Sequence, residues 1–159
     1  MTEVTKSPFG TMPDGRAIEL YTLRNARGTT VAVTTYGARL VSFTREVNGT
    51  PIDIVLGYRS GADYLRDTTS MGGVVGRHAN RIADGRVTVG GHTYQLEQNS
   101  GSRKQNHIHG GTHGLHYHLW MAEPVADGVA LTAISPEGEG GYPGKLEAIV
   151  TYRLTDDDA

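Results

Sequence analysis

Apolar and polar positions alternate in several short segments of the chain, as expected for half-buried β-strands. Residues 17–23 and 29–36 are rich in β-branched and aromatic side chains, and a short polar stretch separates them. This pattern predicts a first hairpin. In the segment 145–154 every second residue is apolar, from Leu146 to Leu154. These side chains should therefore share one face of a strand.

Two-residue turns that contain Gly mark three further predicted hairpins, because such turns need a positive φ. The turns and their strands are Asn48-Gly49 between 40–47 and 51–56, Gly90-Gly91 between 86–89 and 92–96, and Asp127-Gly128 before 129–134. One short helix is expected at residues 60–67, where Ser60 is the N-cap and Asp63 completes a capping box. The pattern predicts an all-β architecture with a single helical turn.

The composition fits one mildly acidic domain that extends over residues 1–159. Glycine contributes 22 of 159 residues, about twice its ordinary share of roughly 7%, so many turns are expected. No apolar run approaches the ~20 residues of a membrane-spanning helix. The first residues, MTEVTKSPFG, lack the apolar stretch of a secretory signal, and the cytoplasm is therefore the expected location.

Charge and cysteine content exclude other classes of function. The 15 Lys and Arg residues are scattered among 17 Asp and Glu residues, so the basic stripe of a nucleic-acid-binding protein is missing. The chain contains no cysteine, which excludes a disulfide framework and thiolate chemistry. Neither a nucleic acid nor a membrane is expected as a partner, and the oligomeric state is left open.

Three segments resemble signature segments of the aldose 1-epimerase (galactose mutarotase) family, in the family's order. They are MGGVVGRHANRIADGRV from Met71, NHIHGGTHGLHYHLW from Asn106 and SPEGEGGYPGKL from Ser135. The segments before Met71 are also similar to the opening of that family, so the resemblance covers nearly the whole chain. It implies a large twisted β-sandwich, truncated here to its N-terminal part.

The resemblance implies the interconversion of the α and β anomers of a free aldose such as galactose or glucose. A base removes the proton of the C1 hydroxyl while an acid protonates the ring oxygen, and the opened ring recloses on the other face. Such an acid and base each contribute about 10² to 10⁴-fold in rate. The only small-molecule partner is then a monosaccharide, and no cofactor or metal is expected.

Three residues match functional positions of the family. Asn80 and Arg81 of the HANRI segment match its sugar-binding pair, and His109 of the HIHGG segment matches its active-site histidine. An arginine can donate two hydrogen bonds to adjacent hydroxyls, and an imidazole can donate or accept near neutral pH. We therefore expect Arg81 and His109 to lie on neighbouring strands or loops and to face one shared concavity.

The remaining groups of the family's active site are expected beyond Ala159. They are a histidine that serves as the general acid, a sugar-binding aspartate and a glutamate that serves as the base. The carboxylates of residues 156–158 follow directly on a predicted strand, and we assign them no catalytic role. The 159 residues alone are therefore expected to be inactive.

Five of the seven histidines fall at positions 107, 109, 113, 116 and 118, which suggests a metal site as an alternative. On a strand His107 and His109 would point the same way, and His113 could complete a three-imidazole site of the cupin-like type. The carboxylate that usually follows such a histidine pair is absent. The last three histidines are expected at the surface or at the rim of the site, where His116 and Leu115 replace an aromatic residue usual in the family.

A second alternative is a noncatalytic carbohydrate-binding module on the same scaffold, because a site can lose its acid or base and keep its binding groups. Aromatic side chains that could stack on a sugar are available, although aromatic residues on strands more often belong to the core. They are Tyr94, Tyr117, Trp120 and Tyr142. The sequence leaves this alternative open.

Overall fold

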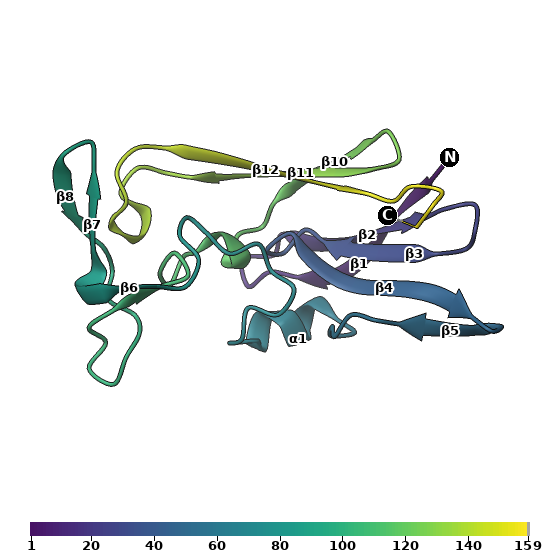
Figure 1. Cartoon of the computed structure of the whole chain (residues 1–159), viewed down its shortest axis with the longest axis horizontal. Helices are drawn as coiled ribbons and strands as arrows, with labels where there is room; N and C mark the ends of the chain where they lie inside the picture. Colours follow the sequence, from purple (N-terminus) through teal and green to yellow (C-terminus); the bar gives the residue numbers. More distant parts are fainter. Residues whose placement is uncertain (159) are drawn as a thin grey trace.

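The computed structural model describes residues 1–158, and two antiparallel sheets dominate it (Figure 1). Five strands form the first sheet as a simple meander in chain order. They are β1 (Glu3–Thr11), β2 (Ala17–Arg24), β3 (Thr30–Thr34), β4 (Arg39–Val47) and β5 (Thr50–Asp53). The second sheet has three strands, β10 (Met121–Val125), β11 (Gly128–Ser135) and β12 (Leu146–Arg153). It lies above the first sheet in the view of Figure 1.

The segment between the two sheets contains the smaller elements. Helix α1 (Gly61–Arg66) lies on the opposite side of the first sheet from the second sheet (Figure 1). Strand β6 (Arg81–Ile82) pairs with β9 (His107–Ile108), and β7 (Arg86–Val89) pairs with β8 (His92–Gln95) at one end of the molecule. Short 3₁₀ turns lie in this segment at η1 (Ala83–Gly85) and η2 (Leu115–Tyr117), and a third, η3 (Glu139–Gly141), lies between β11 and β12.

The first sheet has a hydrophobic core on each of its faces. One core lies between the two sheets, where Leu23 and Val33 meet Val129 and Leu131. The other core lies under α1 and is centred on Tyr64, which packs with residues of β2, β3 and β4. The long buried run from residue 31 to residue 39 follows from this double coverage, because both faces of a central strand are then removed from water.

The predicted all-β architecture is confirmed, and so are the hairpins and the helix. Asn48 and Gly49 have φ values of 53° and 78°, as a tight turn between β4 and β5 requires. Ser60 caps α1, with its Oγ accepting a hydrogen bond of 3.2 Å from the backbone N–H of Asp63. In β12 the side chains of Ala148, Val150 and Tyr152 pack against the core between the sheets, as their alternation predicts.

Four strands are not recognisable from the apolar pattern, namely the long edge strands β1 and β10 and the two-residue strands β6 and β9, and β5 is shorter than predicted. β1 and β10 both lie at sheet edges, and β10 contains Pro124, which an edge strand tolerates because no ladder hydrogen bond is lost there. β5 ends at Asp53 and not at Leu56. The Asp53 carboxylate accepts hydrogen bonds from the backbone N–H groups of Phe43 and Val55, which replaces the ladder with a side-chain turn.

The acidic residues that follow β12 contact the beginning of the chain and the β2–β3 turn. Asp156 lies 3.1 Å from the terminal amine of Met1. Asp158 accepts a hydrogen bond of 2.7 Å from Asn25 and lies near Arg27 and Arg45. The two ends of the described chain therefore lie close together, as Figure 1 also shows.

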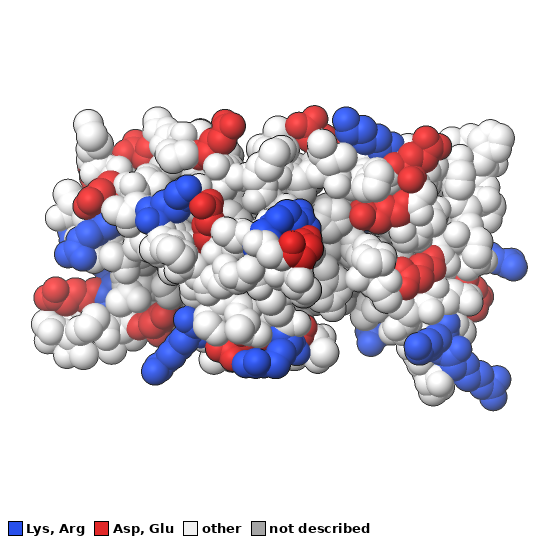
Figure 2. All heavy atoms as spheres, turned by 180° about the vertical axis from the view of Figure 1, so that it is seen from behind, with Lys and Arg blue, Asp and Glu red and all other residues white. Residues whose placement is uncertain are grey.

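Charged side chains of both signs lie on the surface, and the helical elements are short. On the face shown in Figure 2, basic and acidic side chains are interspersed. No helix within residues 1–158 is long and apolar enough to cross a membrane.

Replacement of Leu131 by Ala tests which face of the second sheet meets the first. Leu131 is completely buried between the sheets, so its loss should lower the unfolding free energy by about 2 to 5 kcal/mol. Ile149, on the outer face of β12, is 64% exposed, and Ile149→Ala should cost less than about 1 kcal/mol. Urea unfolding of both variants gives the comparison, and equal losses would contradict the assigned faces.

Candidate functional site

A cavity of about 400 Å³ opens beside the end of β9. This volume lies in the range of small-molecule sites, roughly 300 to 1,000 Å³. The lining residues carry hydroxyl, amide, imidazole and apolar groups, and none of them is acidic, Lys or Arg. They are Thr68, Thr69, Ser70, Asn99, Ile108, His109, Gly111, Thr112, His116 and Tyr117. A cavity with this lining suits an uncharged ligand that has many hydroxyl groups.

His109 follows directly on β9, and the position of its ring is fixed by the segment that leads into β6. The backbone N–H of Asn80 donates a hydrogen bond of 3.0 Å to His109 Nδ1. In return, the N–H of His109 donates to the Asn80 carbonyl at 3.2 Å. Because Nδ1 accepts a hydrogen bond, the neutral ring carries its proton on Nε2. Nε2 has no hydrogen-bond partner within residues 1–158, so it can donate to a ligand.

The backbone around His109 is held in an unusual conformation. His109 and Asn80 have φ values of 56° and 68°, a region that non-glycine residues enter only when their surroundings hold them there. Asn99 supplies part of that restraint. Its side chain accepts from the N–H of Ile108 at 2.8 Å and donates to the carbonyl of Ile108 at 3.1 Å. His109 is therefore presented to the cavity by a fixed strand end.

Arg81 lies on the strand next to His109, as expected, but its side chain does not line the cavity. In the β6–β9 pair Arg81 is opposite Ile108. Both Asn80 and Arg81 are exposed, and Arg81 Nη1 contacts Asn80 Oδ1 at 3.4 Å. Asn80, Arg81 and His109 are thus neighbours. Of these three residues, His109 is the one that lines the cavity.

The glycine after His109 brings the first two signature segments into backbone contact. Gly110 has a φ of 85°, and a Cβ atom there would lie 1.7 Å from the carbonyl oxygen of Gly76. Only glycine permits this approach. The segment from Met71 and the segment from Asn106 are therefore locked together directly beside the site.

The metal-site alternative requires a free ring nitrogen on His107, and both ring nitrogens of His107 already have hydrogen-bond partners. β9 ends at Ile108, so His107 and His109 diverge and do not point the same way, contrary to the strand geometry on which the alternative depends. His107 Nδ1 lies 2.7 Å from the carbonyl of Glu97, and its Nε2 lies 2.8 Å from the hydroxyl of Tyr142. The third ligand of that alternative, His113, is exposed. No cluster of three possible metal ligands occurs among residues 1–158.

The third signature segment contacts the first through Arg77, a role that the sequence does not reveal. The Arg77 guanidinium donates to Ser135 Oγ at 2.9 Å, to the Pro143 carbonyl at 2.9 Å and to the carbonyls of Ser135 and Pro136. It also lies over the ring of Tyr142. The three signatures are therefore one packed unit, and His109 and His116 are the histidines of the second signature that line the cavity.

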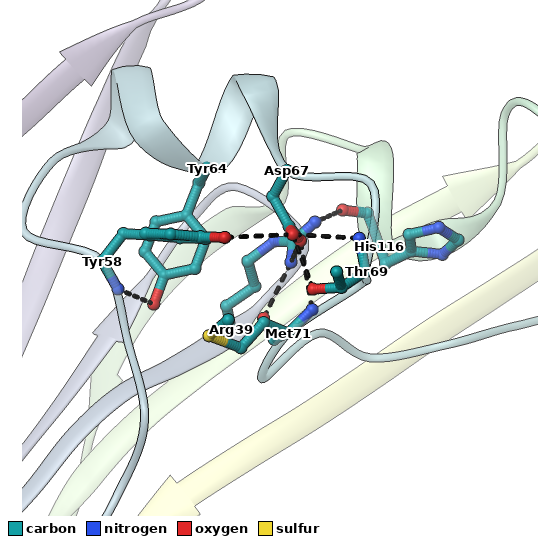
Figure 3. Close-up of polar contacts among 7 residues, drawn as sticks. All are labelled: Arg39, Tyr58, Tyr64, Asp67, Thr69, Met71 and His116. Carbon is teal, nitrogen blue, oxygen red and sulfur yellow. Dashed lines mark hydrogen bonds and ion pairs between the residues drawn. The ribbon is translucent and has the colours of Figure 1, made fainter.

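A buried ion pair holds the cavity wall on the side of α1 (Figure 3). Arg39 of β4 and Asp67, which caps the end of α1, are both completely buried and lie 3.2 Å apart. Arg39 also donates to the Met71 carbonyl at 2.8 Å and to the His116 carbonyl at 3.1 Å. The rings of Tyr36 and Tyr64 lie beside its guanidinium. One arginine thus connects four segments of the chain.

Asp67 has enough hydrogen-bond donors to stay ionised. Burial alone would favour its protonated form, but the hydroxyl and N–H of Thr69, the N–H of Met71 and the Arg39 charge hold the pKa of Asp67 below its ordinary value. The Tyr58 hydroxyl also approaches it at 3.4 Å. These bonds fix the loop that supplies Thr68, Thr69 and Ser70 to the cavity.

His116 is buried, and the prediction that it lies at the surface or the rim is wrong. It is 1% exposed, and in Figure 3 its ring extends away from the Arg39–Asp67 pair. The reason is the tether on its backbone, because the Arg39 bond to its carbonyl holds η2 against the core. His118 contacts the His113 carbonyl and Glu139 and is partly buried, whereas His113 is exposed.

The environment of His116 disfavours its charged form. Burial, followed by the nearby positive charge of Arg39 and the ring of His109, lowers the pKa of His116 to about 4. Its ring makes no hydrogen bond within the described part of the chain, and its Nδ1 is enclosed by protein. The sequence does not reveal the burial of His116, because a histidine within a run of histidines gives no signal of burial.

Of the four aromatic residues that could stack on a sugar, Tyr117 lines the cavity, whereas Tyr94, Trp120 and Tyr142 do not. Trp120 is buried in the core between the sheets, where its Nε1 donates to the Leu115 carbonyl. Tyr142 is buried against His107. Tyr117 lines the cavity, so it is the aromatic residue of this set that a ligand there could contact.

The fold and the cavity define a β-sandwich protein with a neutral, hydroxyl-rich site at a strand end. Comparison with known proteins identifies the family within this class. A sequence model of the aldose 1-epimerase family matches residues 19–159. The chain therefore belongs to the aldose 1-epimerase family.

Individual relatives agree with this assignment. The chain is 39% identical over 156 residues to galactose mutarotase of Rattus norvegicus and 38% identical over 148 residues to aldose 1-epimerase of Escherichia coli (strain K12). The crystal structure of galactose 1-epimerase from Lactobacillus acidophilus NCFM covers 98% of the chain with a TM-score of 0.82 and 30% identity.

The chain spans less than half the length of these relatives. The matched region is 97% of this chain but 44% of the rat protein, and 92% of this chain but 42% of the Escherichia coli protein. For the Lactobacillus structure the matched share is 46%. The likeness therefore covers nearly all of this chain and one part of each relative.

Removal of the Arg39 charge should destabilise the protein strongly. Arg39→Met leaves Asp67 buried without its counter-charge, so the unfolding free energy should fall by about 3 to 5 kcal/mol. Arg45, on the same strand, pairs with Asp158 but has a side chain that is 57% exposed, and Arg45→Met should cost less than about 1 kcal/mol. Similar losses in denaturant unfolding would show that the buried pair does not hold the fold.

The low pKa of His116 should make stability depend on pH. The unfolded chain binds a proton at this residue below about pH 6.5, whereas the folded chain does so only near pH 4. Stability is therefore lost as the pH falls through this range, by about 1 to 3 kcal/mol. Urea unfolding at several pH values should show a weaker dependence in His116→Phe than in the unaltered protein.

His113→Phe is the matched control for this experiment, because the side chain of His113 is exposed. It should keep the pH dependence of the unaltered protein. The assignment is contradicted if the unaltered protein and His116→Phe lose the same free energy between pH 7 and pH 4.

Proposed function

We propose that this chain forms part of an aldose 1-epimerase that interconverts the α and β anomers of free aldohexoses such as galactose and glucose. The observation that carries the proposal is the fixed ring of His109. Its Nδ1 is occupied by Asn80 and its Nε2 is available beside a cavity with an uncharged, hydroxyl-rich lining. The names of the relatives, galactose mutarotase and aldose 1-epimerase, support the same activity.

In this proposal each predicted site residue has a distinct role. His109 donates from Nε2 to an oxygen near the reacting carbon, where it stabilises the negative charge that develops as the ring opens. Arg81 and Asn80, exposed beside His109, bind hydroxyl groups that extend beyond the cavity. No step of this reaction needs a cofactor or a metal.

The proposal treats residues 1–159 as the N-terminal part of a single sandwich domain. The general base is placed outside these residues because no carboxylate lines the cavity within the described chain. The general acid is placed outside them because the family resemblance assigns it to a different histidine, which none of these residues matches. A location in the cytoplasm stays a prediction.

A noncatalytic carbohydrate-binding role is the second proposal. The same observation favours it, since a cavity with donors but no proton-accepting carboxylate can bind a sugar without converting it. The presence of Tyr117 on the cavity wall adds a face on which a sugar ring can stack. Binding and turnover must therefore be measured separately.

Galactose binding tests the site itself. The protein should bind galactose weakly, with amide shifts in NMR spectra at residues around the cavity. Arg81→Ala should weaken binding by about ten-fold, the usual loss for a hydrogen bond from a charged donor, and His109→Ala by about 3- to 10-fold. His92→Ala, on the exposed strand β8, is the control and should bind normally. Unchanged affinity in the first two variants would refute the site.

Polarimetry on freshly dissolved α-galactose tests catalysis. The 159 residues alone should not accelerate mutarotation measurably, because the acid and the base that each supply about 10² to 10⁴-fold are missing. His109→Ala should then leave the observed rate unchanged. A robust acceleration that His109→Ala abolishes would show that this chain contains its own acid and base, and it would exclude the noncatalytic role.

A further inference from the structure

We propose that His116 is a second sugar-contacting residue, which donates a hydrogen bond from Nε2 to an oxygen of the substrate beside His109. The inference rests on the proposed function, because it assigns an additional contact in the same cavity. It concerns a residue within the second signature segment, at a point where this chain departs from the family's usual residues.

The His116 ring is buried and makes no hydrogen bond within residues 1–158. The side chain is 1% exposed and lines the cavity, and neither ring nitrogen has a partner within residues 1–158. A buried polar group that stays unpaired usually costs about 1 to 3 kcal/mol. An imidazole at this position therefore indicates a partner that enters the cavity.

The neutral His116 ring should carry its proton on the nitrogen that faces the cavity. His116 Nδ1 is enclosed by protein and has no partner. A buried N–H without an acceptor is rarer than a buried acceptor without a donor, so the neutral ring should carry its proton on Nε2. Because Nδ1 is enclosed, Nε2 is the nitrogen that a ligand can reach. His116 and His109 then present the same type of donor, an Nε2–H group, to one cavity.

The rings of His109 and His116 lie close together, and their positions are fixed by the surrounding backbone. Their centroids are 6.3 Å apart and their planes are nearly perpendicular. Gly114 leaves room for them, because a Cβ there would lie 2.9 Å from His116 Cε1 and 2.2 Å from the His109 carbonyl oxygen. Arg39 fixes the backbone at the His116 carbonyl. Two donors at this separation can reach different oxygens of one hexose.

The charge state of His116 also suits this role. With a pKa of about 4, the ring is neutral at neutral pH. It therefore acts as a hydrogen-bond donor to a hydroxyl or ring oxygen and not as a cation that attracts an anion. The uncharged lining of the cavity agrees with this choice.

The test compares the affinities of galactose and its monodeoxy derivatives for the unaltered protein and two variants, measured by NMR titration. His116→Phe keeps an aromatic ring and removes the donor, and His113→Phe is the exposed control. We expect His116→Phe to weaken galactose binding by about 3- to 10-fold, and His113→Phe to have no effect. One deoxy sugar should bind the unaltered protein and His116→Phe equally well, because its missing oxygen is the one that His116 contacts.

The outcomes separate this inference from the proposed function. Galactose affinity that is unchanged in His116→Phe but reduced in His109→Ala overturns the inference and leaves the function standing. A uniform loss for all deoxy sugars in His116→Phe also overturns it, since that result indicates a purely structural role. If the unaltered protein binds none of the sugars, the proposed function and the inference are both wrong. NMR spectra without sugar establish that each variant is folded.

Discussion

The ion pair between Arg39 and Asp67 is the interaction on which the shape of the site depends. Both side chains are completely buried, and two charges in such a place are tolerated only when each is surrounded by further hydrogen bonds. Those bonds come from four segments, namely β4, the end of α1, the loop to Met71 and the turn η2. A shift of any of the four would break a hydrogen bond to a buried charge. Two walls of the cavity, at residues 68–70 and at His116, therefore have one common anchor.

The glycine-rich signatures act mainly as architecture around that cavity. Arg77 of the first signature bonds the third, and Tyr142 of the third bonds His107 of the second. Gly110 packs against the backbone of Gly76. The polar side chains of Arg77, His107 and Tyr142 are thus satisfied within the protein, as buried polar groups generally must be. His109 and His116 of the second signature are different, because one ring nitrogen of His109 and both ring nitrogens of His116 lack a hydrogen-bond partner within residues 1–158. These two residues are therefore the ones available for a ligand.

Local chemistry in the sequence predicts the elements whose conformation is decided locally. The Asn48-Gly49 turn, the Ser60 cap and the alternation in β12 all depend on residues close together in the chain, and all are present as predicted. β1 and β10 form because neighbouring strands offer their edges, so their own residues carry little signal. The same holds for the site. The resemblance points to Asn80, Arg81 and His109, but the burial of His116 depends on an arginine 77 residues away in the sequence.

The hydrogen-bond roles in the cavity also bear on the proposed function, because donating a hydrogen bond to a sugar and removing a proton from it require different groups. His109 has its Nδ1 occupied by the N–H of Asn80, so its free nitrogen carries a proton and can donate but not accept. His116 is neutral, and its Nδ1 is enclosed by protein. With its proton on Nε2, the nitrogen that faces the cavity can likewise donate but not accept. Mutarotation requires a group that removes a proton from the C1 hydroxyl, and no carboxylate lines the cavity within residues 1–158. In the proposed function the described residues would therefore stabilise negative charge on a sugar oxygen, and the removal of the proton is assigned to a group outside this cavity lining.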